Sequence, residues 1–321
     1  MGTLKLKATM LLTFFLVFGV LFAFLSIVSL YFGFGAYGAL FISLFFVTAQ
    51  WYFSPKLIRW STKMQPLQKG ENAFLENAVE DLAREAGIPA PQIAIVPDPT
   101  PNAFVFGRTV KSSMLAVHQG LLNTLSKDEV KAVLAHEIGH LKHRDCQLMT
   151  VVSAIPLVAY MMWRSTFFTR RRSKGGGAMI AVGIASLLVY FLSQLLVLSL
   201  SRLREYYADA YSAKATGKPS DLGSALTKIS LGLSRAEKTG NLRAFYIGDP
   251  ITARREISAV ANRSSQYDVN GDGVLDDAEL QRALKEESAS RGARLLELFS
   301  THPRVFRRLD ALKKIEGELA A

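Results

Sequence analysis

The sequence has almost no cysteine: Cys146 is the single one among 321 residues. One cysteine excludes an internal disulfide and suits a reducing compartment. The chain also lacks a phosphate-binding glycine loop, an internal repeat, and an arrangement of serine, histidine and aspartate typical of serine hydrolases. Nucleotide-binding and serine-hydrolase functions are therefore not predicted.

Acidic residues are absent from the first 70 positions. Over the whole chain, 38 lysines and arginines face 27 acids, a net charge of +11. No basic-aromatic nucleic-acid motif accompanies this excess, so a nucleic-acid partner is not predicted. The early basic residues instead flank apolar segments, which favours a membrane surface. They are Lys5, Lys7, Lys56, Arg59, Lys63 and Lys69.

Hydrophobic residues make up 50% of the chain and are concentrated in four segments without any charge. The last of them could extend ~36 Å as a helix, enough for a ~30 Å hydrocarbon core. The first is 23 residues long and is expected to be a retained anchor rather than a signal peptide. The basic flanks predict a cytoplasmic N-terminus. The four segments are 8–30, 38–53, 146–163 and 178–201.

The third and fourth segments allow two topologies. Five basic residues lie between them, and two full crossings would put these charges outside, against the positive-inside rule. The third segment also contains Pro156 and would reach only ~27 Å. Two complete spans and a hairpin that dips into the bilayer both remain open. The five residues are Arg164, Arg170, Arg171, Arg172 and Lys174.

The stretch AHEIGHLKHRD, residues 135–145, carries the chemistry. Ser126 followed by Glu129 predicts a capping-box start for a helix through this stretch. On such a helix His136 and His140 leave the same face one turn apart and can hold one zinc ion. Glu137 between them can act as general base towards a zinc-bound water. A surface helix that matches H-E-x-x-H by chance is the alternative.

A catalytic zinc needs a third protein ligand. His143 lies seven residues beyond His136, roughly 10.5 Å along the helix axis, and is expected to be solvated or interfacial. Glu205 and Asp209 follow the fourth apolar segment on one helix face, at the same membrane depth as His140. Glu205 as ligand and Asp209 as a carboxylate that orients a zinc histidine form a coherent set. An exposed acidic face is the simpler alternative.

These motifs resemble the HtpX family of membrane zinc metalloproteases, relatives of the CAAX prenyl proteases that share the zincin core. The resemblance rests on H-E-x-G-H, on R-E-x-x-A-D at 204–209 and on a late T-H-P at 301–303. It implies zinc on His136, His140 and Glu205, with Glu137 as the base. It also implies cleavage of misfolded or damaged membrane proteins at the cytoplasmic face.

Two further stretches gain roles from the resemblance. Asn102, Ala103 and Phe104 match a family segment beside the active site and are candidate substrate-binding residues, on a strand of a small antiparallel sheet. An exposed edge there could bind extended substrate; a core strand without substrate contact is the alternative. His302 and Arg308 approach the metal site in the family pattern, and His302 could donate to the oxyanion.

Residues 251–292 depart from the family pattern. The run DVNGDGVLDDAE, 268–279, places oxygen ligands and a glycine at EF-hand spacing and predicts calcium binding. An acidic turn that binds nothing is the alternative. The expected ligands are Asp268, Asn270, Asp272, the backbone of Val274, Asp276 and Glu279.

The expected fold class is α+β: a multi-pass helical membrane protein with a mainly helical zincin domain carrying a small β-sheet. The expected partners are the lipid bilayer and unfolded or damaged membrane proteins. The rival functions are a catalytically idle zinc- and calcium-binding scaffold and a specialised prenyl-peptide protease. The expected divisions are 1–53 and 146–201 for membrane segments, 54–145, 202–250 and 293–321 for the zincin domain, and 251–292 for the insert.

Overall fold

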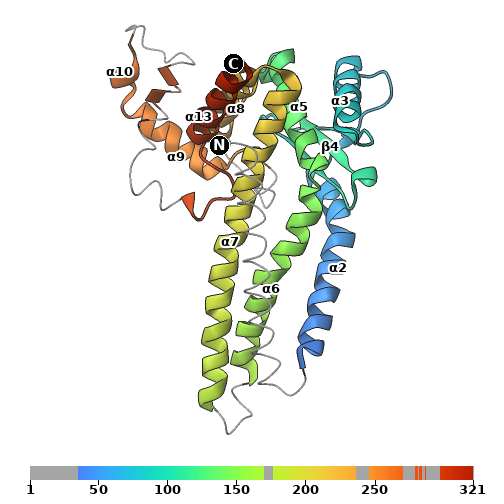
Figure 1. Ribbon diagram of the computed structural model, residues 1–321, viewed down its shortest axis with the longest axis vertical. Helices are drawn as coiled ribbons and strands as arrows, with labels where there is room; N and C mark the ends of the chain where they lie inside the picture. The colour runs from blue at the N-terminus through green and yellow to red at the C-terminus, as the bar shows by residue number, and fades with distance from the viewer. Residues whose placement is uncertain are drawn as a thin grey trace.

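The computed structural model describes residues 35–169, 176–235, 246–269, 279–280, 282–283, 286 and 297–320. These residues form a head of short helices and one small sheet, from which three long helices descend as a stalk (Figure 1). The prediction of a mainly helical chain with a small sheet is thereby confirmed. The stalk helices are α2 (Gly35–Thr62), α6 (Asp145–Thr169) and α7 (Gly176–Thr216).

The sheet is mixed, with strand order β1-β2-β4-β3. β3 pairs antiparallel with β4, but β2 runs parallel to β4, so the predicted all-antiparallel sheet is wrong for that pair. The reason is that β3 precedes β4 in the chain yet lies on its far side, which turns β4 into the direction of β2. β3 is thereby left at the edge. The strands are β1 (Gln65–Pro66), β2 (Gln92–Val96), β3 (Ala103–Phe106) and β4 (Met114–His118).

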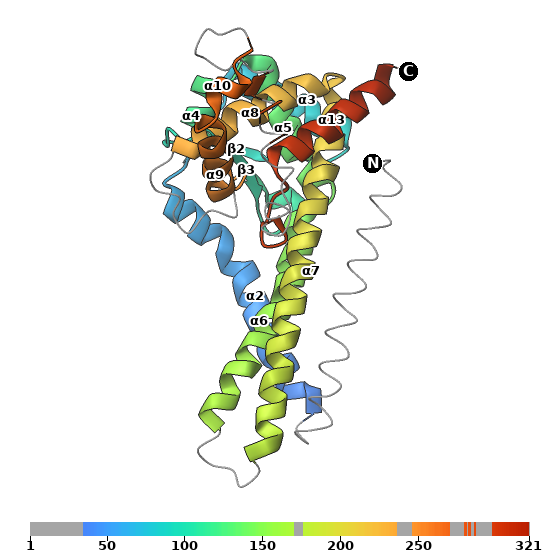
Figure 2. The same ribbon diagram turned by 90° about the vertical axis from the view of Figure 1, so that its left-hand side faces the viewer.

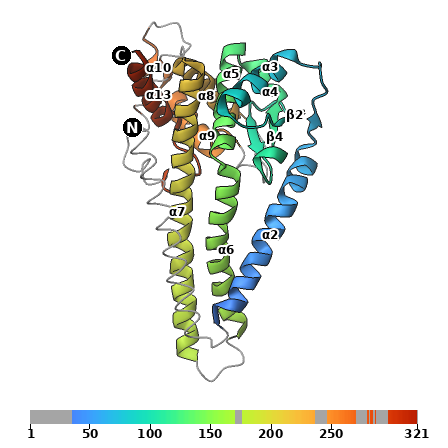
Figure 3. The same cartoon turned by 45° about the vertical axis from the view of Figure 1, so that its right-hand side comes forward.

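The alternation of side chains along β3 gives the sheet two buried faces. Ala103 and Val105 join the main core beneath α3 (Ala73–Ala86) and α5 (Lys127–Lys142). Phe104 and Phe106 point the other way and pack with Ile58 near the end of α2. Figure 3 shows the sheet between these helices and the upper end of α2.

The remaining head helices complete the core. α8 and α13 pack closely, since a Cβ on Gly223 would lie 3.3 Å from Leu309. Leu222, Leu226 and Leu312 belong to the same cluster as the inner face of α5. The other elements are a 3-10 turn at Val110–Ser112, α4 (Gln119–Thr124), α8 (Pro219–Arg235), α9 (Pro250–Ala261), α10 (Ser264–Tyr267) and α13 (Val305–Ala320).

In the stalk, α6 and α7 lie side by side (Figures 1 and 2). Val152 and Ile155 of α6 meet Val197 and Leu200 of α7 in a small apolar cluster. α7 is one continuous helix that carries the fourth apolar segment directly into the motif with Glu205. One continuous helix therefore joins the stalk to the head at the predicted ligand Glu205.

Within the described residues, one helix, Ile180–Thr216, is long and apolar enough to cross a membrane. The apolar part of α6 is shorter, Asp145–Leu157. The predicted segment 8–30 lies outside the described residues, as do Arg170, Arg171, Arg172 and Lys174. α2 continues beyond the predicted end at Phe53, through Pro55, and its last turns pack against the sheet.

Of the predicted calcium ligands, Asn270, Asp272, Val274 and Asp276 lie outside the described residues. The two ends of that loop are described, and the backbone N–H of Val269 donates to Oε1 of Glu279 at 2.8 Å. Val260, Tyr267, Leu280 and Ala283 form one apolar cluster around these ends.

Candidate metal centre

The start of α5 follows the predicted capping box. Oγ of Ser126 accepts from the backbone of Glu129 at 3.3 Å, and the Glu129 carboxylate accepts from the backbone of Ser126 at 2.8 Å. Gly139 marks a close approach between α5 and α7: a Cβ there would lie 3.1 Å from Cδ1 of Tyr211. α7 can therefore press against α5 and bring Glu205 to the two histidines.

The three predicted zinc ligands converge. Nε2 of His136 lies 3.2 Å from Nε2 of His140, and the Glu205 carboxylate lies 3.5 Å from the first and 3.6 Å from the second. Ligand atoms ~2.0–2.1 Å from a tetrahedral zinc are roughly 3.3 Å apart, so the spacing fits the ion. Among the residues that the structure describes, Oε2 of Glu205 is buried without a hydrogen-bond partner. The donor set and its geometry thus suit zinc.

Carboxylates lie behind both histidines. Nδ1 of His140 is 2.6 Å from Oδ2 of Asp145, and Nδ1 of His136 is 3.0 Å from Oδ1 of Asp209, a close ion-pair contact that is poorly aligned for a hydrogen bond. Burial lowers the pKa of His136, but Asp209 and Glu205 outweigh it and raise the pKa to about 9. The same negative surroundings favour a metal cation. Sequence reasoning missed Asp145, although its place five residues after His140 is a usable signal.

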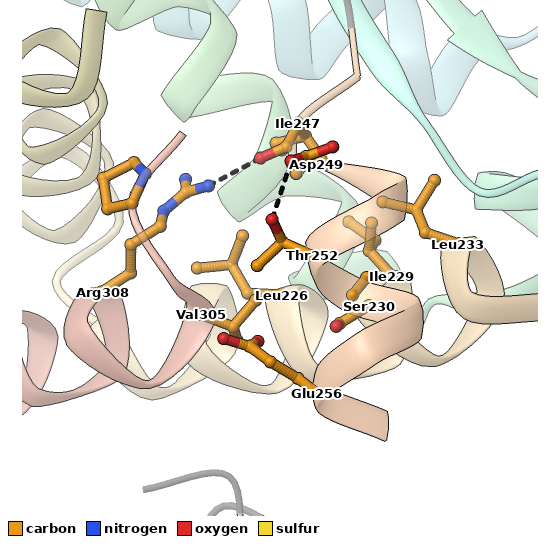
Figure 4. A pocket seen from close by; sticks show the side chains of 13 residues that line it. Leu226, Ile229, Ser230, Leu233, Ile247, Asp249, Thr252, Glu256, Val305 and Arg308 are labelled. Atoms are coloured by element: carbon orange, nitrogen blue, oxygen red, sulfur yellow. Dashed lines mark hydrogen bonds between the residues drawn. The ribbon is translucent and has the colours of Figure 1, made fainter. Parts of the chain in front are cut away.

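Arg308 contacts Asp209 and is not among the residues that line the cavity beside the three ligands. Its guanidinium donates to both carboxylate oxygens, at 2.8 and 2.7 Å, and Nη1 donates to the carbonyl of Ile247 at 2.7 Å (Figure 4). Nη1 also lies 3.5 Å from Glu205. Arg308 therefore neutralises and orients these two carboxylates.

Glu137 faces a cavity of about 360 Å³ beside the three ligands. The backbone N–H of Val105 in β3 donates to Oε2 of Glu137 at 3.0 Å and sets the direction of the carboxylate. Burial raises the pKa of Glu137. A raised pKa brings a carboxylate closer to the range in which it can both accept and return a proton near neutrality.

His302, in the segment before α13, also lines this cavity. Its Nε2 lies 3.8 Å from Oε1 of Glu205, and its Nδ1 lies 2.9 Å from the hydroxyl of Thr301. Burial lowers the pKa of His302, so the ring is neutral at pH 7. A neutral imidazole at this position can offer one N–H to a polar group in the cavity.

The remaining predicted residues either line the cavity or lie outside it. Ala103 and Phe104 line the cavity, whereas the amide oxygen of Asn102 accepts from the backbone of Ile247 at 3.0 Å and so serves the fold. His143 stays outside the cluster, with its ring 4.1 Å from that of Tyr207. Burial lowers the pKa of His143 to about 4. Of the two expected environments for His143, solvated or interfacial, the structure shows the interfacial one.

Comparison with known proteins agrees with this geometry. The model of peptidase family M48 matches residues 69–316. A "Protease HtpX homolog" from Methanothermobacter thermautotrophicus is 42% identical over 74% of this chain and 91% of that protein. A "Protease HtpX homolog 2" from Methanosarcina mazei is 34% identical over 99% and 97%. The crystal structure of S. mikatae Ste24p shares the fold, with a TM-score of 0.53 at 22% identity over 97% of this chain and 67% of that one.

Proposed function

Because this chain belongs to peptidase family M48 and is a metalloprotease of the HtpX type, we propose that it is a zinc endopeptidase of membrane-protein quality control. Its substrates would be misfolded or damaged membrane proteins, cut at the cytoplasmic face. The observation that carries this proposal is the convergence of His136, His140 and Glu205 beside Glu137 in one cavity.

The roles follow from the contacts. His136, His140 and Glu205 would hold zinc, which lowers the pKa of a bound water towards ~7 and polarises the substrate carbonyl. Glu137 takes the proton from the attacking water and returns it to the leaving amine. His302 donates a hydrogen bond to the carbonyl oxygen as negative charge develops on it.

Substrate would bind in extended form along β3. β3 is an edge strand whose residues line the cavity, and Val105 connects it directly to Glu137. Backbone pairing with an edge strand gives affinity without demanding one sequence. Such binding suits a protease of unfolded chains, because unfolded segments are extended and vary in sequence.

The stalk supports membrane placement. Trp51, Phe53 and Trp60 expose aromatic rings near the upper end of α2, and aromatic residues concentrate at membrane–water interfaces. Segments 146–163 and 178–201 then lie in the bilayer, either as two spans or as a dipping hairpin. A single cysteine at position 174 in a Cys146→Ser background distinguishes them. Labelling only from outside supports two spans, and labelling only from the cytoplasm supports the hairpin.

The insert would bind calcium. The ligand spacing of residues 268–279 supports this, together with the contact between Val269 and Glu279 that draws the loop ends together. Arg304, just before α13, forms an ion pair with Glu256 on α9 at 3.4 Å. The position of α9 therefore affects the position of the segment that carries His302. Calcium would thereby influence the approach to the cavity.

Digestion of an unfolded soluble protein by the purified full chain tests the proposed function. Cleavage should be lost with a zinc chelator, return when zinc is added back, and be absent in Glu137→Gln. Full zinc binding without cleavage of any unfolded protein would instead favour the idle scaffold. Cleavage confined to prenylated peptides would favour the specialised protease.

A further inference from the structure

A second cavity, of about 250 Å³, lies next to the catalytic one. Phe104 and Tyr246 line both cavities, so they form the wall between them. The other lining residues come from the end of α2, from the end of β2 and the turn after it, from the residue before β3 and from the end of β4. We call it the His118 pocket, after the residue at the end of β4. Its polar lining includes Ser61, Lys63, Asp98, His118 and Tyr246.

His118 is a buried histidine whose second nitrogen is unsatisfied. Its side chain is 5% exposed, and Nδ1 lies 3.0 Å from the carbonyl oxygen of Thr100, so Nδ1 carries the proton. Nε2 is buried and has no hydrogen-bond partner in the described part of the chain. Burial lowers the pKa of His118, which keeps the ring neutral. Nε2 is therefore a lone pair that needs a donor.

The other polar groups add negative character. The Asp98 carboxylate lies 4.0 Å from Nδ1 of His118, and burial together with the charge of Asp98 raises the pKa of Tyr246. The positive charge on the rim, Lys63, is exposed and can turn to solvent. The pocket thus offers acceptors inside and one carboxylate at its side.

Hydrogen bonds within the protein hold the wall of the His118 pocket in place before any ligand binds. Oδ1 of Asp98 accepts from the backbone of Thr100 at 2.7 Å, and the carbonyl of Asp98 accepts from Gly120 at 3.0 Å. A Cβ on Gly120 would lie 1.9 Å from the carbonyl oxygen of Pro99, so the turn sits directly on α4. A preformed pocket binds without the entropy loss of ordering its own residues.

We infer that the His118 pocket is a specificity subsite that takes the side chain of a lysine or arginine in the substrate. A substrate strand paired with β3 passes the wall formed by Phe104 and Tyr246 and can extend one side chain beyond it. A basic side chain has the donors that Nε2 of His118 and the Tyr246 hydroxyl accept, and its charge complements Asp98. Its apolar stem suits the ring of Phe104. This inference rests on the proposed proteolytic function.

The first test is the pattern of cleavage. The zinc-loaded full chain is given a mixture of peptides of random sequence, and the products are sequenced by mass spectrometry. Lysine and arginine should be enriched roughly tenfold at one fixed distance from the cut bond, the discrimination expected of a hydrogen bond to a charged group. Enrichment of neutral residues at that position, or no enrichment, would overturn the inference.

Variants assign the preference to His118. His118→Phe should remove the enrichment at that one position and leave preferences elsewhere unchanged, which a merely structural defect would not do. His118→Gln keeps an acceptor of similar reach and should retain most of it. Gln119→Ala, an exposed neighbour on α4, is the matched control and should behave as wild type. An unchanged preference in His118→Phe would refute the assignment.

A binding measurement separates this inference from the proposed function. Full-length Glu137→Gln protein with ¹⁵N-labelled histidine has five imidazoles to observe. N-acetyl-lysine amide should shift the Nε2 resonance of His118, whereas N-acetyl-norleucine amide, which has the same stem without the ammonium, should not. Equal responses to both would overturn the inference. A selective shift with no proteolysis by wild type would mean that the pocket stands and the proposed function fails.

Discussion

Arg308 donates to both carboxylate oxygens of Asp209, at 2.8 and 2.7 Å, with both side chains about 1% exposed. Asp209 in turn lies 3.0 Å from Nδ1 of His136. The orientation of a candidate zinc ligand on α5 thus depends on an arginine 99 residues beyond Asp209 in the chain. Removing one of two buried charges that neutralise each other leaves the other charge unpaired and causes a large loss of folding stability.

Arg308→Ala should therefore destabilise the protein by ~3–5 kcal/mol, because it leaves Asp209 charged, buried and unpaired. Arg308→Lys keeps the charge but not the two-point geometry, and should weaken zinc binding ~10–100-fold. Thermal melting measures the change in stability, and zinc titration against a competing chelator measures the change in zinc affinity. Arg84→Ala, whose ion pair with Asp81 on α3 is exposed on both sides, is the control and should change stability by less than ~1 kcal/mol. Wild-type melting and zinc affinity in Arg308→Ala would contradict this account.

Glu137→Gln should retain zinc and lose ~10²–10⁴-fold in turnover, the usual contribution of a general base. The amide oxygen can still accept from the backbone of Val105, so the fold around the cavity is preserved. Metal content by atomic spectroscopy and turnover on an unfolded protein are measured on the same sample. Turnover within threefold of wild type would assign the base to another residue.

Glu205→Ala should lose both zinc and activity, because two histidines alone hold the ion weakly. Glu318→Ala, an exposed acid on α13, is the control. The difference from Glu137→Gln is the metal content: low in Glu205→Ala, full in Glu137→Gln. The third-ligand assignment fails if Glu205→Ala keeps stoichiometric zinc and normal turnover.

Glu256 should make stability depend on pH. It lines a cavity of about 20 Å³ with Ser230 and Thr252 (Figure 4), and burial raises its pKa to about 7 although Arg304 opposes the rise. An acid whose pKa is higher in the folded state loses stability as pH rises from its unfolded pKa, ~4.3, to its folded one. Relative to Glu256→Gln, wild type should lose on the order of 2 kcal/mol between pH 5 and pH 8.

Melting temperatures of wild type and Glu256→Gln across that pH range measure this difference. Glu318→Gln, at an exposed position on α13, is the control and should follow the wild-type curve. Parallel curves for wild type and Glu256→Gln would mean that the carboxyl of Glu256 is already ionised at pH 5.

The insert should bind calcium with a dissociation constant in the range ~10⁻⁷ to 10⁻³ M. Calorimetry on the zinc-loaded full chain measures it, and Glu279→Gln, which removes the carboxylate at loop position 12, should weaken binding at least tenfold. Turnover measured at constant zinc and varied calcium tests regulation. Calcium that binds without any change in turnover would make the loop a structural element only.

The features that the sequence alone determined are local. The start of α5 at Ser126 and the common face of His136 and His140 depend on residues within one or two helical turns. Hydrogen bonding between residue i and residue i+4 sets such relationships, whatever the rest of the chain does. The family, too, follows from short motifs in a fixed order.

Only the tertiary structure decided which residues of different helices and strands contact each other. The parallel pairing of β2 with β4 and the contact of Arg308 with Asp209 each join segments whose order in space is not encoded by local periodicity. His118 is the clearest example. In sequence it is one polar residue at the end of an apolar strand. Only the packing of Thr100, Asp98 and Tyr246 around it makes its Nε2 a buried acceptor beside the catalytic cavity, without a partner in the described part of the chain. Burial and partnership are properties of the assembled core, because they depend on which distant surfaces exclude water together.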